Sequence, residues 1–341
     1  MTTIRLAMIG SRGHHGIVLR ELPSLPQVEL VAVAAGGDTV VPLLEWAQKS
    51  GRSAPRVFDD HATMLTDVRP DAVVVCGPFE RHASMCVEAL DRGIHVYTEK
   101  PAALSIAELE QLRRAVDRNP GVRLVGMMQG RYMPGFYTAW QLVRDGAIGD
   151  VRLFNARKSY KLGKRPDYYR DRDTYGGTIP WVGSHAIDWI YWIASVGRGD
   201  DRAGFTSVFA WHSTAGNAGI GTMERSAVCL FTLESDRAAT VSIDVFRPEA
   251  APTHGDDWIR VVGSKGIIEA RPEWLSLIDA THDGTTAHPV ACDRTPFADF
   301  IADIAGQQPA LIDARDTLDL TEACLLARQS ADEVKLIAFR R

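Results

Sequence analysis

Short apolar runs alternate with helical patterns over the first hundred residues, and this alternation limits the fold more than any other feature. The helical patterns cover Ile17 to Leu22, Pro42–Lys49, Ala62–Leu65 and His82–Arg92. The apolar runs are Ile4–Ile9, Val28–Ala35, Val57–Phe58, Asp71–Cys76 and His95–Glu99. Continuous apolar strands separated by helices are typical of βαβ units, in which helices cover both faces of a parallel sheet. The sequence therefore predicts an α/β domain of the Rossmann type.

A glycine-rich loop follows the first predicted strand and precedes the first predicted helix. Glycines at this point allow a tight turn and a close approach of the backbone to a pyrophosphate, which the helix N-terminus also attracts. The spacing is GxxGxxG instead of the commoner GxGxxG, but its strand–loop–helix context is the required one. We expect Arg12 either to pair with a phosphate or to be solvated. The predicted dinucleotide contacts in this loop are Gly10, Ser11, Arg12, Gly13, His14, His15 and Gly16.

The end of the second strand leaves the choice between NAD and NADP open. An acidic residue about twenty positions after the glycine loop usually binds the adenosine ribose. Here Ala35 occupies that place and Asp38 follows three residues later, while no arginine directly follows the strand. Asp38 is therefore the predicted ribose contact, with a slight preference for NAD.

The fourth and fifth strands lead into the motifs that identify a family. Gly77, Pro78 and His82 follow the fourth strand, and Glu99-Lys100-Pro101 follows the fifth. Further along the chain lie Arg131-Tyr-Met-Pro134, Asp145-Gly-Ala-Ile-Gly149, Gly176-Gly177 before His185, and Val262-Gly-Ser-Lys-Gly266. With the glycine loop, these motifs resemble the glucose–fructose oxidoreductase / inositol dehydrogenase / rhizopine-catabolism (Gfo/Idh/MocA) family over nearly the whole chain. We expect Gly77, Pro78, His82, Glu99 and Lys100 to line the dinucleotide site.

The resemblance implies two domains. Residues 1–125 would form the NAD(P)-binding Rossmann domain, and residues 126–341 a substrate-binding and oligomerisation α/β domain with a large, open, mainly antiparallel sheet, whose C-terminal helices can pack back on the first domain. Segments rich in β-branched and aromatic residues agree with such a sheet. They are Val151–Tyr160, Phe205–Ser213, Arg225–Leu233, Ala238–Phe246, Trp258–Val262 and Ile267–Ala270, with helices expected over Pro296–Ile304 and from Leu318 to Ile337. Family members commonly pair through this sheet, so a homodimer or homotetramer is expected.

Two residues are candidates for catalysis. Lys100 follows a parallel strand at the end where open α/β sheets bind their ligands, and its ammonium can hydrogen-bond a substrate oxygen. His185 lies in the first turn of a predicted helix that Ser184 would cap, and it suits a general base near neutral pH. Asp188 shares its helix face. Asp188 would orient His185, stabilise its charge or contact another domain.

One position departs from the family's pattern. Similar dehydrogenases usually carry an aspartate four residues before the histidine, and Trp181 stands there instead. Tryptophan cannot accept a proton, but its flat ring suits stacking on a sugar or an aromatic substrate. Either Lys100 and His185 suffice for catalysis, or the reaction differs from simple polyol oxidation.

The segment between residues 157 and 175 is rich in arginine, lysine and tyrosine. It would be a mobile loop over the substrate, with Tyr160, Lys161 and Tyr169 contacting hydroxyls or an acidic group. A solvated loop with Arg–Asp pairs at an oligomer contact is an equal alternative. Arg131 follows the sixth strand and is a further candidate for the substrate cleft.

Composition excludes several other classes of protein. The chain of 341 residues has a net charge of −5, which gives no electrostatic footprint for nucleic acid. Five scattered cysteines without CxxC spacing argue against a disulfide framework and a zinc site, and we expect no metal. No apolar run is long enough to cross a membrane, and no signal peptide is recognisable, so we expect a cytoplasmic protein.

The sequence thus predicts an NAD(P)-dependent oxidoreductase that transfers hydride between nicotinamide and a carbinol carbon of a sugar, inositol or related polyol. Two alternatives stay open. One is an NAD-dependent glycoside hydrolase of the same fold. The other is a non-catalytic dinucleotide-binding regulator. The absence of the usual aspartate at Trp181 supports this alternative, whereas the presence of both Lys100 and His185 argues against it. The substrate itself is not evident from the sequence, because a few side chains on loops determine it.

Overall fold

The computed structural model describes residues 3–199, 202–217, 219–287 and 289–339, and the chain divides into two compact units. The first unit comprises Met1–Met127, Asp173–Gly176 and Arg294–Thr321. The second comprises Met128–Arg172, Gly177–Asp293 and Glu322–Arg341. The first division at Met127 lies close to the boundary expected at residue 125, whereas Arg294–Thr321 belongs to the first unit.

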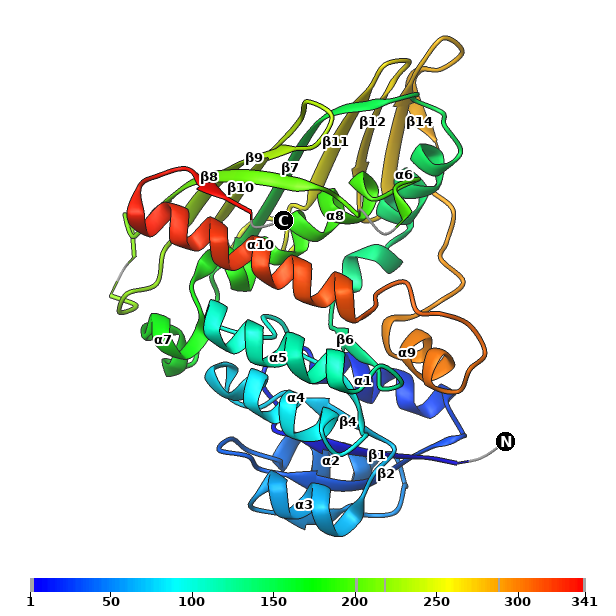
Figure 1. Cartoon of the computed structure of the whole chain (residues 1–341), viewed down its shortest axis with the longest axis vertical. Helices are drawn as coiled ribbons and strands as arrows, with labels where there is room; N and C mark the ends of the chain where they lie inside the picture. Colours follow the sequence, from blue (N-terminus) through cyan, green and yellow to red (C-terminus); the bar gives the residue numbers. More distant parts are fainter. Residues whose placement is uncertain (1–2, 200–201, 218, 288, 340–341) are drawn as a thin grey trace. The chain divides into compact units, whose positions relative to one another are not determined.

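The first unit is built on a six-stranded parallel sheet with the strand order β3-β2-β1-β4-β5-β6 (Figure 1). The central strands are apolar because helices cover both faces, and all four residues of β4 are buried. The predicted Rossmann sheet is confirmed. Its strands are β1 (Ile4–Ile9), β2 (Val28–Ala34), β3 (Arg56–Phe58), β4 (Ala72–Val75), β5 (His95–Thr98) and β6 (Leu124–Gly126).

Helices alternate with these strands. They are α1 (His15–Glu21), η1 (Leu22–Ser24), α2 (Val41–Lys49), α3 (His61–Val68), η2 (Phe79–Arg81), α4 (His82–Leu90) and α5 (Ile106–Arg118). Ser105 caps α5: its side chain accepts from the Glu108 amide at 3.2 Å, and the Glu108 carboxylate accepts from the Leu104 amide at 2.8 Å.

A late segment of the chain completes the first unit. Helix α9 (Pro296–Ile304) begins at the carboxylate of Glu21, which accepts hydrogen bonds from the amides of Phe297 and Ala298 at 3.0 and 2.9 Å. The ring of Phe300 stacks on Tyr97 of β5, with the centroids 5.3 Å apart. A capped helix terminus and an aromatic contact thus attach the segment to the Rossmann sheet.

The second unit contains a nine-stranded sheet with the order β14-β13-β12-β11-β7-β10-β9-β8-β15 (Figure 1). Its pairs are antiparallel except for β7 and β10, so the predicted open, mainly antiparallel sheet is confirmed. The strands are β7 (Val151–Lys161), β8 (Phe205–Ser213), β9 (Ser226–Leu233), β10 (Arg237–Arg247), β11 (Trp258–Gly263), β12 (Ile267–Arg271), β13 (Trp274–Ile278), β14 (Asp283–Ala287) and β15 (Ile337–Ala338).

The helices of this unit are η3 (Gln129–Tyr132), α6 (Pro134–Arg144), η4 (Asp167–Arg170), the π-helical turn η5 (Ile179–Gly183) and α8 (Ser184–Ala194). The short helix α7 (Arg172–Tyr175) and the long helix α10 (Ala314–Glu333) each contain residues of both units. We expected the last helix to reach Ile337. Instead α10 ends before Val334, whose φ of 50° is left-handed, and Ile337 pairs with β8 as part of β15.

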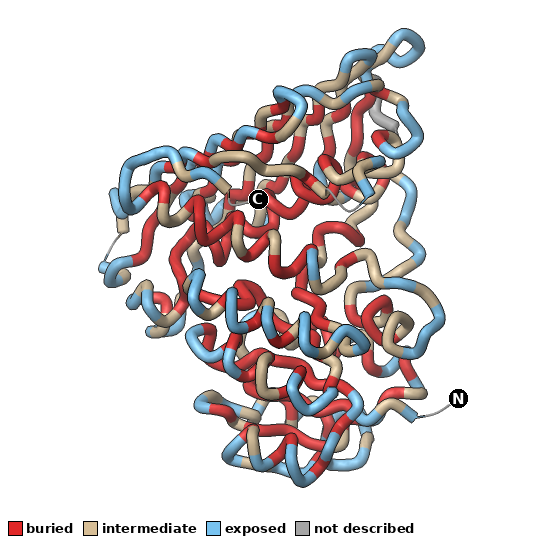
Figure 2. Tube along the Cα trace, viewed as in Figure 1, coloured by how far each residue is buried: buried red, intermediate tan, exposed pale blue. Residues whose placement is uncertain are grey.

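The two faces of the nine-stranded sheet differ. Helices α6 and α8 pack on one face, where alternate residues such as Cys229 and Phe231 are fully buried. The residues between them point the other way, as the two-residue period of a strand requires. Phe209, Trp211, Val228, Leu230 and Phe246 are 40–55% exposed there, and we call these five residues the open apolar face. Figure 2 shows the buried and exposed positions of these strands.

Candidate active site

The glycine loop lies between β1 and α1, against the ends of two other strands. Gly10 has a φ of 67°, and a Cβ atom there would lie 2.6 Å from the carbonyl oxygen of Cys76. A Cβ at Gly13 would lie 2.5 Å from the Glu99 carboxylate. These two glycines are therefore required by the chain's own packing. A Cβ at Gly16 would meet nothing within 4 Å, so the third glycine leaves open space.

Glu99 is the group that fixes this loop. Its fully buried carboxylate accepts hydrogen bonds from the His14 amide at 2.5 Å and the Lys100 amide at 3.0 Å, and the His14 Nδ1 atom lies 2.8 Å away. Burial alone would raise the pKa of Glu99. The contacts with His14 and the nearby Lys100 ammonium outweigh it and lower the pKa to about 2. Glu99 thus holds the loop as a buried anion.

Asp38 lies beside the same loop. Its carboxylate accepts a hydrogen bond from the Ser11 amide at 3.0 Å, and the Arg12 Nε atom lies 3.6 Å from it. Arg12 is also 3.9 Å from Glu80. The Arg12 guanidinium therefore lies near two carboxylates and is not simply solvated, and its contact with a phosphate stays a prediction. Ser11 further donates from its hydroxyl to the Thr39 carbonyl at 2.9 Å.

Three more predicted cofactor residues surround the end of β4. His82 is fully buried, with its ring nitrogens 3.0 Å from the Pro101 carbonyl and 3.1 Å from the Gly77 carbonyl. Burial lowers the pKa of His82. Pro78 directly precedes η2. His82 therefore joins the loops after β4 and β5, a structural role that the sequence did not indicate.

Lys100 is the predicted catalytic residue of the first unit. It follows β5 directly, is only 2% exposed, and its Nζ atom lies 3.9 Å from the Glu99 carboxylate. Its peptide bond to Pro101 is cis. The lysine thus lies at the carboxyl end of a parallel strand, where open α/β sheets bind their ligands.

His185 is the predicted catalytic residue of the second unit, and it is buried near the beginning of α8. The predicted cap at Ser184 is wrong. Ser184 has helical backbone angles and continues the helical path of η5. That path already includes a hydrogen bond from the Trp181 amide to the Gly177 carbonyl. Trp181 and His185 are therefore successive positions along one helical segment.

Asp188 and Arg131 form a buried ion pair, and both side chains are 1% exposed. Arg131 donates to the Asp188 carboxylate from Nη2 at 2.6 Å and from Nε at 3.0 Å. The guanidinium also lies 5.5 Å from the ring centroid of Trp192. This pair anchors η3 to α8.

The predicted substrate residues Tyr160, Lys161 and Tyr169 lie on or after β7. The Tyr160 ring packs near that of His254, with centroids 5.1 Å apart, and Lys161 donates to the Glu249 carbonyl at 2.7 Å. Tyr169 is buried against Trp181, with centroids 4.5 Å apart. Trp181 is thus part of an aromatic cluster.

Three residues of this region were not predicted as site residues from the sequence. Lys158 and Asp257 form a buried ion pair, and the Lys158 ammonium lies 4.7 Å from the Tyr160 ring centroid. Burial lowers the pKa of Lys158 and raises that of Asp257. Arg165 lies over Trp181. Lys158 shares a strand face with Tyr160, two residues away, and this period was the available signal.

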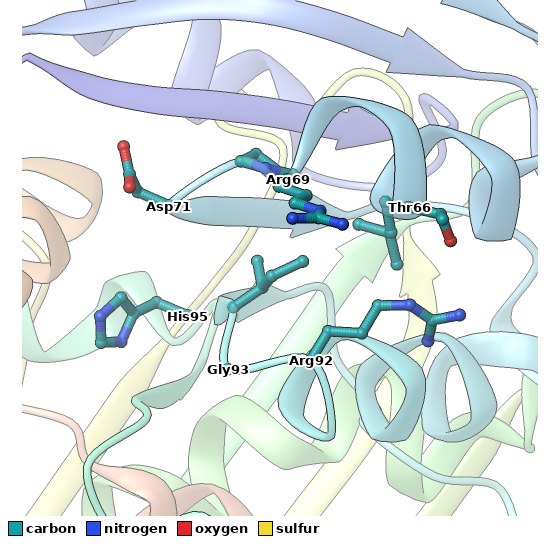
Figure 3. Close-up of a pocket in the computed structure, with 9 residues that line it drawn as sticks. Thr66, Arg69, Asp71, Arg92, Gly93 and His95 are labelled. Carbon is teal, nitrogen blue, oxygen red and sulfur yellow. The ribbon is translucent and has the colours of Figure 1, made fainter.

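A pocket of about 570 Å³ lies elsewhere in the first unit (Figure 3). Its lining includes Arg69, Asp71, Arg92 and His95, which adjoin the amino ends of β4 and β5. The glycine loop and Lys100 follow the carboxyl ends of their strands. Ligands of open parallel sheets bind at those carboxyl ends, so we do not assign this pocket to the candidate site.

Residues 4–127 match the family model described as oxidoreductase family, NAD-binding Rossmann fold, and residues 136–269 match the GFO/IDH/MocA C-terminal domain. The chain belongs to the Gfo/Idh/MocA oxidoreductase family. A solved oxidoreductase structure from Thermotoga maritima is 37% identical, with a TM-score of 0.90, and the match covers 98% of this chain and all of the other.

Two further similar proteins are more distant. The inositol 2-dehydrogenase of Salmonella typhimurium is 28% identical over 56% of this chain, and the match spans only 53% of that enzyme. Levoglucosan dehydrogenase, solved with NADH and levoglucosan, shares the fold at a TM-score of 0.82 and 16% identity, with all of both chains covered. Within the described residues, no helix is long and apolar enough to span a membrane, and no group of histidine, cysteine and carboxylate side chains is arranged to hold a metal ion.

The loop after β1 suits the dinucleotide that this family binds. Space remains open at Gly16, and the Nδ1 atom of the adjacent His15 is buried without a hydrogen-bond partner in the described part of the chain. The first unit thus retains both room and an unsatisfied polar atom at the point where a pyrophosphate approaches in a Rossmann fold.

The buried charge of Glu99 gives a testable prediction. Glu99→Gln should lower the free energy of unfolding by about 3 kcal/mol near pH 7, because it removes the anion that His14 and Lys100 face. Since the folded-state pKa is depressed, this stabilisation is complete above about pH 4.5 and disappears as the pH falls toward about 2. Urea unfolding at several pH values should therefore show a difference from the wild type that shrinks in acid.

The matched control is Glu29→Gln, which changes an exposed glutamate on β2. It should have little effect at any pH. A Glu99→Gln difference that stays constant between pH 7 and pH 3 would show that the carboxylate charge is not the stabilising feature.

Proposed function

We propose that the protein is an NAD-dependent dehydrogenase that oxidises a carbinol carbon of a sugar, inositol or related polyol. The observation that carries the proposal is Lys100, a buried lysine directly after β5, beside the glycine loop of an NAD-binding oxidoreductase family. Glu99 supports it, because one carboxylate contacts both the loop and the lysine.

The proposed chemistry divides between two residues. The bound nicotinamide supplies a hydride acceptor. The Lys100 ammonium donates a hydrogen bond to the substrate oxygen and stabilises negative charge that develops there. The His185 imidazole accepts the hydroxyl proton. Trp181 offers a flat surface for the substrate.

The residues proposed to hold the cofactor are those of the glycine loop, Asp38 and the loops after β4 and β5. The substrate contacts are proposed for Trp181, Tyr160, Lys161, Tyr169 and the Arg131–Asp188 pair. We also propose that the protein works in the cytoplasm, because its dispersed cysteines, all free in the structure, suit a reducing compartment.

Lys100 provides the direct test. Lys100→Met keeps much of the apolar stem and removes the charge, so we expect turnover to fall about 100- to 10,000-fold while the affinity for NAD changes little. Nicotinamide absorbance with a panel of sugars and polyols measures turnover, and calorimetry measures binding. Lys49→Met, an exposed lysine on α2, is the control. Binding of NAD to the wild type without reduction of NAD by any substrate of the panel would overturn the proposed dehydrogenase activity.

Asp38 determines the expected cofactor preference. Its carboxylate lies beside the loop and should repel the 2′-phosphate of NADP, so NADH should bind more tightly than NADPH. Asp38→Ala should weaken both cofactors, because Ser11 loses its acceptor, but it should reduce the preference. Asp59→Ala at the end of β3 is the control. A wild type that prefers NADPH would contradict this assignment.

The open apolar face predicts self-association. Five apolar side chains on adjacent strands form a patch of the kind that marks an interface, and we propose a homodimer or homotetramer through it. Val228→Glu should weaken association at least tenfold, measured by light scattering during size-exclusion chromatography. Val57→Glu is the matched control, since Val57 lies on β3 and is also 55% exposed. A monomeric wild type would refute the proposal.

A further inference from the structure

Arg165 occupies an unusual position beside the aromatic cluster of the second unit. Its guanidinium carbon lies 4.7 Å from the ring centroid of Trp181 and 5.5 Å from that of Tyr169. The side chain is partly buried on these two rings, which are themselves in contact. Aromatic faces attract a guanidinium, so the rings hold the charge in a defined place.

The donors of Arg165 are largely unused. Among the described residues it forms no ion pair, and its one hydrogen bond runs from Nη2 to the Lys161 carbonyl at a long 3.4 Å. The Nε atom is buried without a partner. Burial also lowers the pKa of Arg165, which indicates that the charge is poorly solvated here. A partly buried cation without a counter-ion is costly, and a bound anion would offset this cost.

The surroundings do not supply that anion. Lys158, Lys161 and Arg165 all act to lower the pKa of His254, so these basic groups face the same region, although burial is the main cause of that shift. The Asp257 carboxylate is nearby but is already bound to Lys158. The region therefore has an excess of positive charge, in a chain whose net charge is −5.

The position of Trp181 connects this charge to the candidate catalytic residue. Trp181 precedes His185 by four residues on one continuous helical segment, and residues at this spacing lie on the same side of a helix. Arg165 therefore lies on the ring one turn before His185. A group bound by Arg165 would belong to the same ligand that His185 deprotonates.

We propose that Arg165 binds a carboxylate of the substrate, so that the protein acts on a sugar acid in preference to a neutral sugar. The planar guanidinium offers Nε and a neighbouring Nη as a side-on pair of donors, which matches the two oxygens of a carboxylate. Trp181 and Tyr169 keep this fork in place. This inference rests on the proposed dehydrogenase and names the substrate class of its site.

The test uses matched pairs of substrates with the NAD-bound protein: D-glucuronate with D-glucose, and D-galacturonate with D-galactose. We expect a higher kcat/KM for the acid of at least one pair. Arg165→Gln should lower that value about 10- to 100-fold, mainly through KM, because a charge-assisted hydrogen bond is lost. The neutral partner should change less than threefold. Arg165→Lys, which keeps the charge without the fork, should be intermediate.

Arg170→Gln is the matched control, since Arg170 is in the same segment but exposed and paired with Asp167. It should change neither substrate, and thermal unfolding checks that all variants are folded. The inference would be overturned if Arg165→Gln changed kcat/KM equally for acids and neutral sugars, or if the wild type preferred the neutral member of both pairs. Neither result would contradict the proposed dehydrogenase activity.

Calorimetry with the same sugars separates the two proposals further. Binding of a sugar acid that depends on Arg165, without reduction of NAD, would support the carboxylate site and overturn the dehydrogenase. Absence of binding and of turnover for both acids would overturn the carboxylate site.

Discussion

The buried carboxylate of Glu99 is the interaction on which the candidate site most depends. It accepts hydrogen bonds from the loop that follows β1 and from the residue that follows β5, so one side chain fixes the relative position of two strand ends. A neutral residue could fill the same space, but it could not satisfy His14 and lie beside the Lys100 ammonium. The cost of burying this charge is offset only because both partners are present, and the loop, the carboxylate and the lysine therefore form one unit.

The second unit also contains buried charges, which form ion pairs with each other. Arg131 and Asp188 neutralise each other in the core and attach η3 to α8, and Lys158 and Asp257 form a second buried pair at β7. Each of these charges has a partner within the chain. Arg165 contrasts with them, because its contacts are aromatic rings that cannot neutralise it. This difference between Arg165 and the two buried ion pairs is the basis of the proposed carboxylate site.

The sequence predicted the fold better than it predicted the site. Apolar runs set β1, β2 and β4 almost to the residue, because a parallel strand buried on both faces tolerates little else. The β-branched and aromatic residues of β8 and β9 were also informative, because such side chains suit a sheet with one buried face. The C-terminal limit of α10 was missed because a single left-handed residue, Val334, ends a helix that the local pattern would continue.

Long-range side-chain pairing explains what could not be predicted about the site. His82 begins α4 after strand β4, yet its ring nitrogens lie near the carbonyl oxygens of Pro101 and Gly77, which are far apart in the sequence. Asp188 shares a helix face with His185, yet its partner is Arg131, fifty-seven residues earlier. The spacing of residues in the sequence shows which side chains share a helix or strand face. The contact that each side chain makes depends on a residue from another helix, strand or loop, and the sequence does not show it. Trp181 illustrates the point: its place in the sequence did not show that Arg165 and Tyr169 would pack on its ring.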